Sequence, residues 1–141
     1  MTRMTGRCRC GAIRWEITGE TLWQVHCHCD DCRRATSSAF TSYIGVLHEN
    51  VQWTGPAPVA HNTSPGVERS HCGDCGSPIL FVSQVWPDEA HLFAASLDDP
   101  SQFQPQAHVF WAERVAWGDV HDSLPKYPTL SDQSKPAPDA P

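Results

Sequence analysis

The stretch "VHCHCDDCRR", residues 25–34, places Cys27, Cys29 and Cys32 within six positions and includes His26 and His28. A segment of this composition can be a redox centre, part of a disulfide set, or a metal site that is complete or lacks one ligand. The last possibility matters most for function, because a metal ion with an unfilled position can bind a substrate.

Two shorter motifs flank this stretch: "RCRCGA" carries Cys8 and Cys10, and "HCGDCGS" carries Cys72 and Cys75. Each motif ends in Cys-Gly, and the glycine can take the positive φ that a tight metal-binding turn requires. Together the two pairs supply four sulfurs, which is the ligand set of a closed, tetrahedral zinc site.

The chain has seven cysteines, an odd number that suits a closed set of disulfides poorly. Joining either outer pair to the central motif would gather five sulfurs, whereas a division into four and three gives one filled and one open tetrahedral site. His28, or less readily His26, could close the central site. Strand alternation would, however, turn the His28 ring away from its neighbouring cysteines.

Most of the remaining chain shows the pattern of short strands between turns. In "AIRWEI" (12–17), Ile13, Trp15 and Ile17 alternate with Arg14 and Glu16, which is the period of a half-buried strand. Further strand candidates are "LWQV" (22–25), "AFTSYIGV" (39–46), "VQWT" (51–54), "PVAHN" (58–62), "VERSH" (67–71), "PILFVS" (78–83), "AHLFAAS" (90–96) and "AHVFWAE" (107–113).

Only "DDCRRATS" (30–37) has a helical pattern, with Asp30 or Asp31 as its N-cap. The sequence therefore predicts an all-β fold with one short helical turn, in which short antiparallel strands form two small sheets held together by metal.

A chain of 141 residues is the size of one domain, which we assign to residues 1–127. Residues 128–141, "PTLSDQSKPAPDAP", are rich in Pro, Ser and Asp and predict a disordered tail. No apolar run is long enough to span a membrane, and the first residues lack the apolar region of a secretory signal, so we expect a cytoplasmic protein. A net charge of −6 makes nucleic acid a poor partner.

Four segments carry a resemblance to a known family: "GRCRCGAIRWEI", "HCHCDDCRRATSSAF", "SHCGDCGSPIL" and "AHVFWAERVAWGDVHDSLPKY". Together they resemble the glutathione-dependent formaldehyde-activating enzyme (Gfa) family, which includes centromere protein V. The resemblance covers roughly residues 6–127 and gives every cysteine a place. Two positions depart from the family pattern: Ser37 stands where a glycine is usual, and Val115 where a polar residue is common.

The resemblance implies a β-tent fold with two zinc ions per chain. Cys8, Cys10, Cys72 and Cys75 would hold a structural zinc, and Cys27, Cys29 and Cys32 a catalytic zinc with an open position. The implied activity is that of a carbon–sulfur lyase, which condenses glutathione with formaldehyde or reverses that step. His108 matches a histidine of the family's C-terminal motif.

These assignments lead to a mechanism in which a thiol enters the open position and its thiolate adds to an aldehyde to give a hemithioacetal. Arg33 and Arg34, and also Arg69, are candidates to bind the carboxylates of glutathione, and we take His108 as a further substrate-binding residue. The rival hypothesis is a zinc-scaffolded interaction module without catalysis, which predicts either a fourth protein ligand at the central site or no thiol-dependent activity. The sequence leaves the oligomeric state open.

Five tryptophans need a place in this fold, and for most of them we expect packing in the core rather than a position in a cleft. They are Trp23, Trp53, Trp86, Trp111 and Trp117.

Overall fold

The computed structural model of the chain describes residues 3–118, 123–125, 127 and 134. These residues form one α-helix, α1 (Asp30–Thr36), and ten strands: β1 (Met4–Arg7), β2 (Arg14–Ile17), β3 (Trp23–Cys27), β4 (Thr41–Leu47), β5 (Val51–Thr54), β6 (Val59–Ser64), β7 (Val67–His71), β8 (Pro78–Ser83), β9 (Glu89–Phe93) and β10 (Ala107–Val109). Five 3-10 turns complete the described part: η1 (His48–Asn50), η2 (Ala94–Ser96), η3 (Pro100–Gln102), η4 (Trp111–Glu113) and η5 (Ala116–Gly118).

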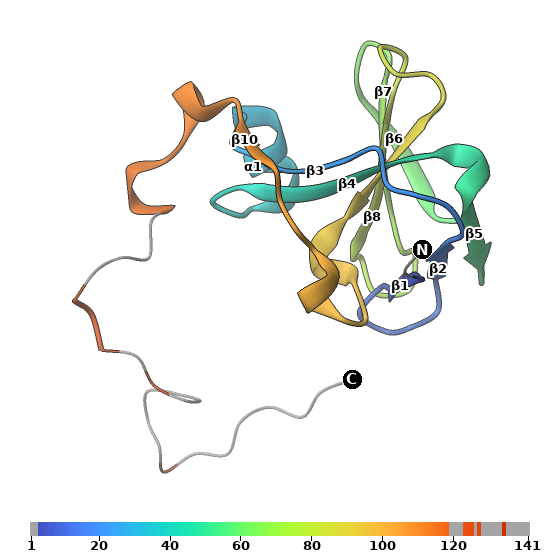
Figure 1. The fold of residues 1–141 in the computed structure, drawn as a ribbon, viewed down its shortest axis with the longest axis horizontal. Helices are drawn as coiled ribbons and strands as arrows, with labels where there is room; N and C mark the ends of the chain where they lie inside the picture. Colours follow the sequence, from blue (N-terminus) through green and yellow to red (C-terminus); the bar gives the residue numbers. More distant parts are fainter. Residues whose placement is uncertain (1–2, 119–122, 126, 128–133, 135–141) are drawn as a thin grey trace.

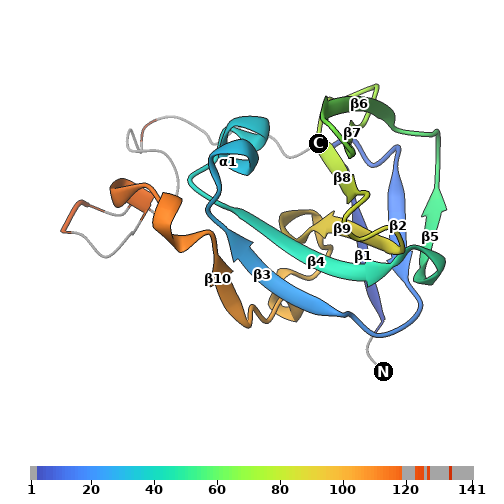
Figure 2. The same ribbon diagram turned by 90° about the horizontal axis from the view of Figure 1, so that it is seen from above.

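The strands form two sheets, as predicted (Figures 1 and 2). The smaller sheet has the order β1-β2-β5, and the larger one has the order β10-β3-β4-β9-β8-β7-β6. Every pairing between these strands is antiparallel except that of β10 with β3. After β9 the chain passes through η2 and η3 and then forms β10 beside β3. This long connection lets β10 run in the same direction as β3.

The main core lies along the alternating face of β2. Ile13, Trp15 and Ile17 are almost completely buried, as the alternation predicted, and they pack with Ile44 and Leu92 of the larger sheet. Each such side chain contributes about 2 kcal/mol of hydrophobic stabilisation. Cys8 and Cys72 belong to this same core, whereas Cys27 and Cys32 lie in a second cluster with Tyr43 and Phe93. The two groups of cysteines therefore belong to different parts of the core.

The prediction for the tryptophans is wrong for most of them. Trp53, Trp86, Trp111 and Trp117 are exposed, Trp117 by 73%, and Trp23 is half-buried. The reason is their position: β5 is an edge strand, Trp86 lies in the turn between β8 and β9, and the last two follow β10.

The segment after β10, orange in Figures 1 and 2, leads away from the sheets. The tail predicted for residues 128–141 lies outside the described residues apart from Ser134, and its prediction stays untested. Within the part of the chain that is described, no helix has the length and apolarity needed to cross a membrane.

Candidate metal centres

The first group of cysteines joins two turns that lie far apart in the sequence. Cys8 and Cys10 lie in the turn after β1, and Cys72 and Cys75 lie between β7 and β8. Their four sulfurs all lie within 4.8 Å of one another, as the sequence predicted. The glycine that follows each pair has a positive φ, 80° at position 11 and 79° at position 76, which is the conformation expected for these turns.

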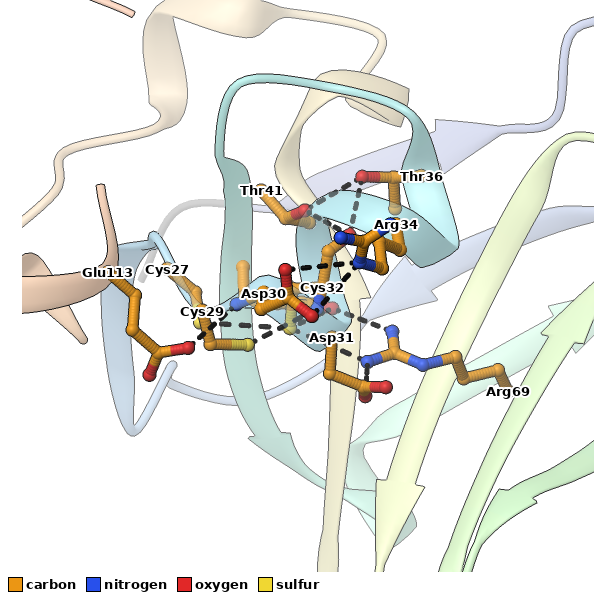
Figure 3. A network of polar contacts seen from close by, with 11 residues as sticks. Cys27, Cys29, Asp30, Asp31, Cys32, Arg34, Thr36, Thr41, Arg69 and Glu113 are labelled. Carbon is orange, nitrogen blue, oxygen red and sulfur yellow. Dashed lines mark hydrogen bonds and ion pairs between the residues drawn. The ribbon is translucent and has the colours of Figure 1, made fainter. Parts of the chain in front are cut away.

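The second group forms where β3 runs into α1. Cys27 ends the strand, Cys29 is the N-cap of the helix, and Cys32 lies in its first turn (Figure 3). The thiol of Cys29 accepts the backbone N–H of Cys32 at 3.2 Å. The prediction of an Asp30 or Asp31 cap is therefore wrong by one or two positions, because the cysteine sulfur takes the role that a carboxylate would have had.

No fourth His, Cys, Asp or Glu from the described part of the chain joins the second group, whose three sulfurs lie within 4.8 Å of one another. His28 instead faces His108, with 2.9 Å between its Nε2 and the Nδ1 of His108. His26 contacts the Ser42 hydroxyl at 2.8 Å. Burial, together with the nearby His108, lowers the pKa of His28 and keeps its ring neutral at pH 7.

The three sulfurs of the second group have different surroundings. The Cys27 thiol donates a hydrogen bond to Cys32 Sγ, and this contact, assisted by Tyr43 and Arg69, lowers the pKa of Cys32 to about 5 although the residue is buried. The same contact raises the pKa of Cys27. The lowered pKa favours the thiolate form of Cys32, which is the form that binds metal.

The spacing of the sulfurs fits zinc in both groups. A Zn–S bond of about 2.3 Å in a tetrahedron places neighbouring sulfurs about 3.8 Å apart. The sulfurs of Cys8 and Cys10 are 3.6 Å apart, those of Cys10 and Cys72 are 3.9 Å apart, and those of Cys27 and Cys32 are 3.7 Å apart. All seven cysteines are free thiols. Each group could therefore hold one metal ion, the first with four ligands and the second with three.

Comparison with known proteins shows the family of the chain. The model of the family described as "Glutathione-dependent formaldehyde-activating enzyme" matches residues 3–113. The chain belongs to this family. A protein of Halomonas elongata, provisionally named a glutathione-dependent formaldehyde-activating enzyme, is 25% identical over 130 residues, which cover 83% of this chain and 80% of that protein.

The fold is also shared with a solved structure. The crystal structure of a Rhodobacter sphaeroides protein superposes with a TM-score of 0.60 and 20% sequence identity, and the match covers 74% of this chain and 99% of that one. The two proteins therefore share a fold.

Three of the residues that we expected to bind substrate, Arg33, Arg34 and His108, lie around the second group without converging on its sulfurs. The fourth, Arg69, lies 3.5 Å from Cys32 Sγ. Arg33 and Arg34 both form ion pairs with Asp30, at 3.1 and 3.0 Å. His108 is exposed, and its ring contacts the His28 ring, which helps to hold β10 beside β3.

Sequence reasoning missed two side chains beside the second group, Tyr43 and Glu113. The Tyr43 hydroxyl donates to Cys32 Sγ at 3.4 Å, and a carboxylate oxygen of Glu113 accepts the backbone N–H of Asp30 at 3.0 Å. A hairpin register could have found Tyr43, because Thr41 pairs with Cys27 and Tyr43 lies two residues further on the same face. Nothing in the sequence indicated Glu113, because its contact depends on the path of the chain after β10.

A cleft of about 590 Å³ lies near both groups. Its lining residues include Cys8, Arg9, Thr41 and Phe93. No cysteine of the second group is among the residues that line it, so we assign the cleft no part in the chemistry of that group.

Proposed function

We propose that this chain is a zinc-dependent carbon–sulfur lyase that joins a thiol such as glutathione to an aldehyde such as formaldehyde, or cleaves the adduct. The observation that carries the proposal is the unequal division of the cysteines: four sulfurs in one group, and three in another that no fourth ligand from the described residues completes. Three protein ligands and one open position are typical of catalytic zinc sites. Membership of the family supports the choice of thiol and aldehyde.

In this proposal Cys8, Cys10, Cys72 and Cys75 hold a structural zinc, and Cys27, Cys29 and Cys32 hold the catalytic one. When bound to the open group, zinc acts as a Lewis acid that lowers the pKa of a thiol. The net reaction forms a C–S bond from the sulfur to the carbonyl carbon, and the thiol proton ends on the carbonyl oxygen. Cleavage of the adduct reverses both changes.

The protein's part is to hold the three sulfurs in place and to receive the substrates. The Cys32 N–H fixes Cys29, and the Glu113 carboxylate fixes the first amide of α1. We propose Arg33 and Arg34 as binders of the thiol's carboxylates, which would compete with Asp30 for these guanidinium groups. His108 is the proposed third substrate-binding residue.

We further propose that the protein acts in the cytoplasm and binds neither nucleic acid nor membranes. The acidic net charge of −6 supports this, because it opposes binding to phosphate backbones. The rival function, a zinc-scaffolded interaction module, predicts a closing fourth ligand or no thiol-dependent activity. His28 is turned towards His108 and does not supply that ligand, so the activity measurement decides between the two functions.

The test combines metal analysis with a rate measurement. The purified full chain should contain two zinc ions. It should also speed the exchange between glutathione, formaldehyde and S-hydroxymethylglutathione beyond the spontaneous rate, measured by exchange NMR with ¹³C-formaldehyde. Cys29→Ser should lose this acceleration and one zinc, whereas Glu49→Ala, at an exposed 3-10 turn, should keep both. A protein with two zinc ions and only the spontaneous rate would favour the interaction module.

A further inference from the structure

Arg69, on β7, reaches across to the helix that carries Cys32 (Figure 3). Its Nη2 lies 2.7 Å from the Asp31 carboxylate and 3.5 Å from Cys32 Sγ. Its Nη1 donates to the Tyr43 hydroxyl at 3.2 Å, and that hydroxyl donates in turn to Cys32 Sγ at 3.4 Å. Arg69 and Tyr43 thus both direct a donor at the same sulfur.

The guanidinium is buried as well as bonded. The Arg69 side chain is 11% exposed, and its Cζ lies 4.8 Å from the centre of the Phe81 ring. A buried cation needs anionic or strongly polar partners. Asp31 supplies one carboxylate, but that residue is itself 62% exposed, and the other groups that Arg69 contacts are the Tyr43 hydroxyl and the Cys32 sulfur. The site is therefore suited to a negatively charged sulfur at Cys32.

The cysteines do not share this environment. Cys29 Sγ accepts the backbone N–H of Cys32. In the four-cysteine group, the sulfur of Cys8 accepts a backbone N–H, that of Cys75 contacts the Ser77 hydroxyl, and no cationic side chain of the described residues hydrogen-bonds to a sulfur. A guanidinium therefore hydrogen-bonds to a sulfur in the three-cysteine group, whereas beside the four-cysteine group the Arg7 guanidinium donates to the backbone carbonyl of Cys8.

The guanidinium beside Cys32 affects which ligand can bind at the open position. Three thiolates and a divalent ion carry a charge of −1, which opposes the approach of an anionic fourth ligand. A guanidinium beside the cluster offsets part of this repulsion. A hydrogen bond to a thiolate also withdraws charge from its sulfur, so that the metal receives less from that ligand. A closed group has no ligand to recruit and needs neither effect.

We propose that Arg69, held by Asp31 and Tyr43, is a positioning residue that weakens Cys32 as a metal donor and makes the open position favour an anionic ligand. This inference rests on the proposed metal-binding role of the three cysteines, and it assigns Arg69 to the metal site rather than to a substrate carboxylate. It identifies the ligand of the open position as an anion, such as a thiolate, rather than a neutral molecule.

The test uses the full chain loaded with cobalt(II), with azide as the anionic probe and the thiolate-to-cobalt absorption as the signal. In Arg69→Gln, loss of the charge-assisted hydrogen bond should move this band to lower energy and weaken azide binding by about tenfold or more. Tyr43→Phe, which removes only the hydroxyl, should change the band energy and the azide affinity in the same direction and by smaller amounts. Arg3→Gln is the matched control, because it removes the same charge from an exposed side chain that is paired with Glu16, and it should leave the band and the azide affinity unchanged.

Cobalt content and far-UV circular dichroism identify the variants that are folded and loaded. A folded Arg69→Gln protein with two cobalt ions, an unchanged band and unchanged azide affinity would overturn the inference. If Arg69→Gln does not fold, an unchanged band and affinity in Tyr43→Phe would overturn it equally. One cobalt ion per wild-type chain would overturn both the inference and the proposed function. Azide effects as expected, but no thiol–aldehyde exchange, would reject only the proposed reaction.

Discussion

Ser37 ends helix α1 in a backbone conformation that serine adopts at a cost. Its φ is 52° and its ψ is 40°, in the left-handed region, and its N–H bonds to the Arg33 carbonyl. The left-handed conformation costs a residue with a Cβ about 1–2 kcal/mol, a penalty that glycine escapes. The resemblance described in the sequence analysis implies a glycine at this position, and the positive φ gives the physical reason.

Ser37→Gly should therefore stabilise the metal-loaded protein. We expect a gain of about 0.5–1 kcal/mol, because relief of the left-handed strain exceeds the larger entropy of glycine in the unfolded chain. Urea unfolding followed by circular dichroism measures the change. Ser37→Ala is the control, since alanine keeps the Cβ and should bring no gain. Equal stabilities for the two variants would contradict the explanation.

Gly45 is required by a close approach of Trp23. The two residues pair across β3 and β4, and a Cβ at position 45 would overlap the indole ring. That ring is held in place by a 3.3 Å hydrogen bond from its Nε1 to the Glu89 carboxylate and by an edge contact with His91.

Gly45→Ala should consequently destabilise the protein by about 1–3 kcal/mol, the usual cost of forcing a packed side chain to move. Urea unfolding gives the stability, and tryptophan fluorescence of the folded state should also change as the Trp23 ring shifts. Gly118→Ala serves as the comparison, because a Cβ there would meet only side-chain atoms at 3.3 Å or more. A loss of the same size in both variants would mean that the indole contact is not the cause.

At the scale of elements, β10 and η4 hold the loop between β3 and α1. The Val109 carbonyl accepts the N–H of His28 at 3.0 Å, His108 contacts the ring of the same residue, and Glu113 accepts the N–H of Asp30. All three contacts fall on the residues that separate Cys27 from Cys32. The C-terminal part of the described fold therefore fixes the loop that carries the open cysteine group.

Glu113→Ala should loosen the first turn of α1 without unfolding the sheets. Removing an acceptor from a helix N-terminus costs about 0.5–2 kcal/mol, so the Asp30 amide should exchange with solvent several-fold faster. Amide hydrogen exchange by NMR reads this position directly. Glu49→Ala provides the control, because Glu49 is exposed and lies in η1, remote in sequence from both cysteine groups. Unchanged exchange at Asp30 in Glu113→Ala would contradict the role of this contact.

The elements differ in how far the sequence could predict them. The sequence located nine of the strands: alternation found β2, where Ile13, Trp15 and Ile17 mark one buried face, and turn residues on either side marked the other eight. It missed β1, "MTGR", which is short and whose Gly6 lies against the Trp15 ring and contributes no side chain to the pattern. The sequence also did not predict that β10 runs parallel to β3. The direction of a strand depends on the connection that leads to it, and the residues of the strand itself do not indicate it.

For the whole molecule, the cysteine spacing predicted the three-cysteine group, since sulfurs two or three residues apart can converge from a single turn. The four-cysteine group joins two distant turns, and its prediction came from dividing the seven cysteines into one filled and one open set. The cysteine spacing did not predict which side chains surround the two groups. Arg69 and Tyr43 reach Cys32 from two other strands, and only the strand order of the larger sheet brings them together. Long-range packing of this kind decides what chemistry a metal site performs, and a single sequence does not encode it in a readable pattern.

The two groups also differ in how much of the molecule depends on them. The four-cysteine group ties residues 8–10 to residues 72–75, and two of its members are buried in the main core. The second group lies within six consecutive residues, at the end of one strand and the start of one helix. Loss of metal from the first group should therefore release long-range contacts, whereas loss from the second should disturb the fold only locally.

Cys10→Ser and Cys29→Ser form a matched pair that tests this difference, because neither residue is fully buried. Structural zinc contributes about 10–16 kcal/mol of apparent binding free energy, as much as the whole stability of a typical domain. We therefore expect Cys10→Ser to be largely unfolded at 25 °C and Cys29→Ser to keep its sheets with one zinc ion. Circular dichroism melting and metal analysis check both, and chelation of the wild type should first remove the ion from the open group while the sheets persist. Equal loss of structure in the two variants would show instead that both ions are structural.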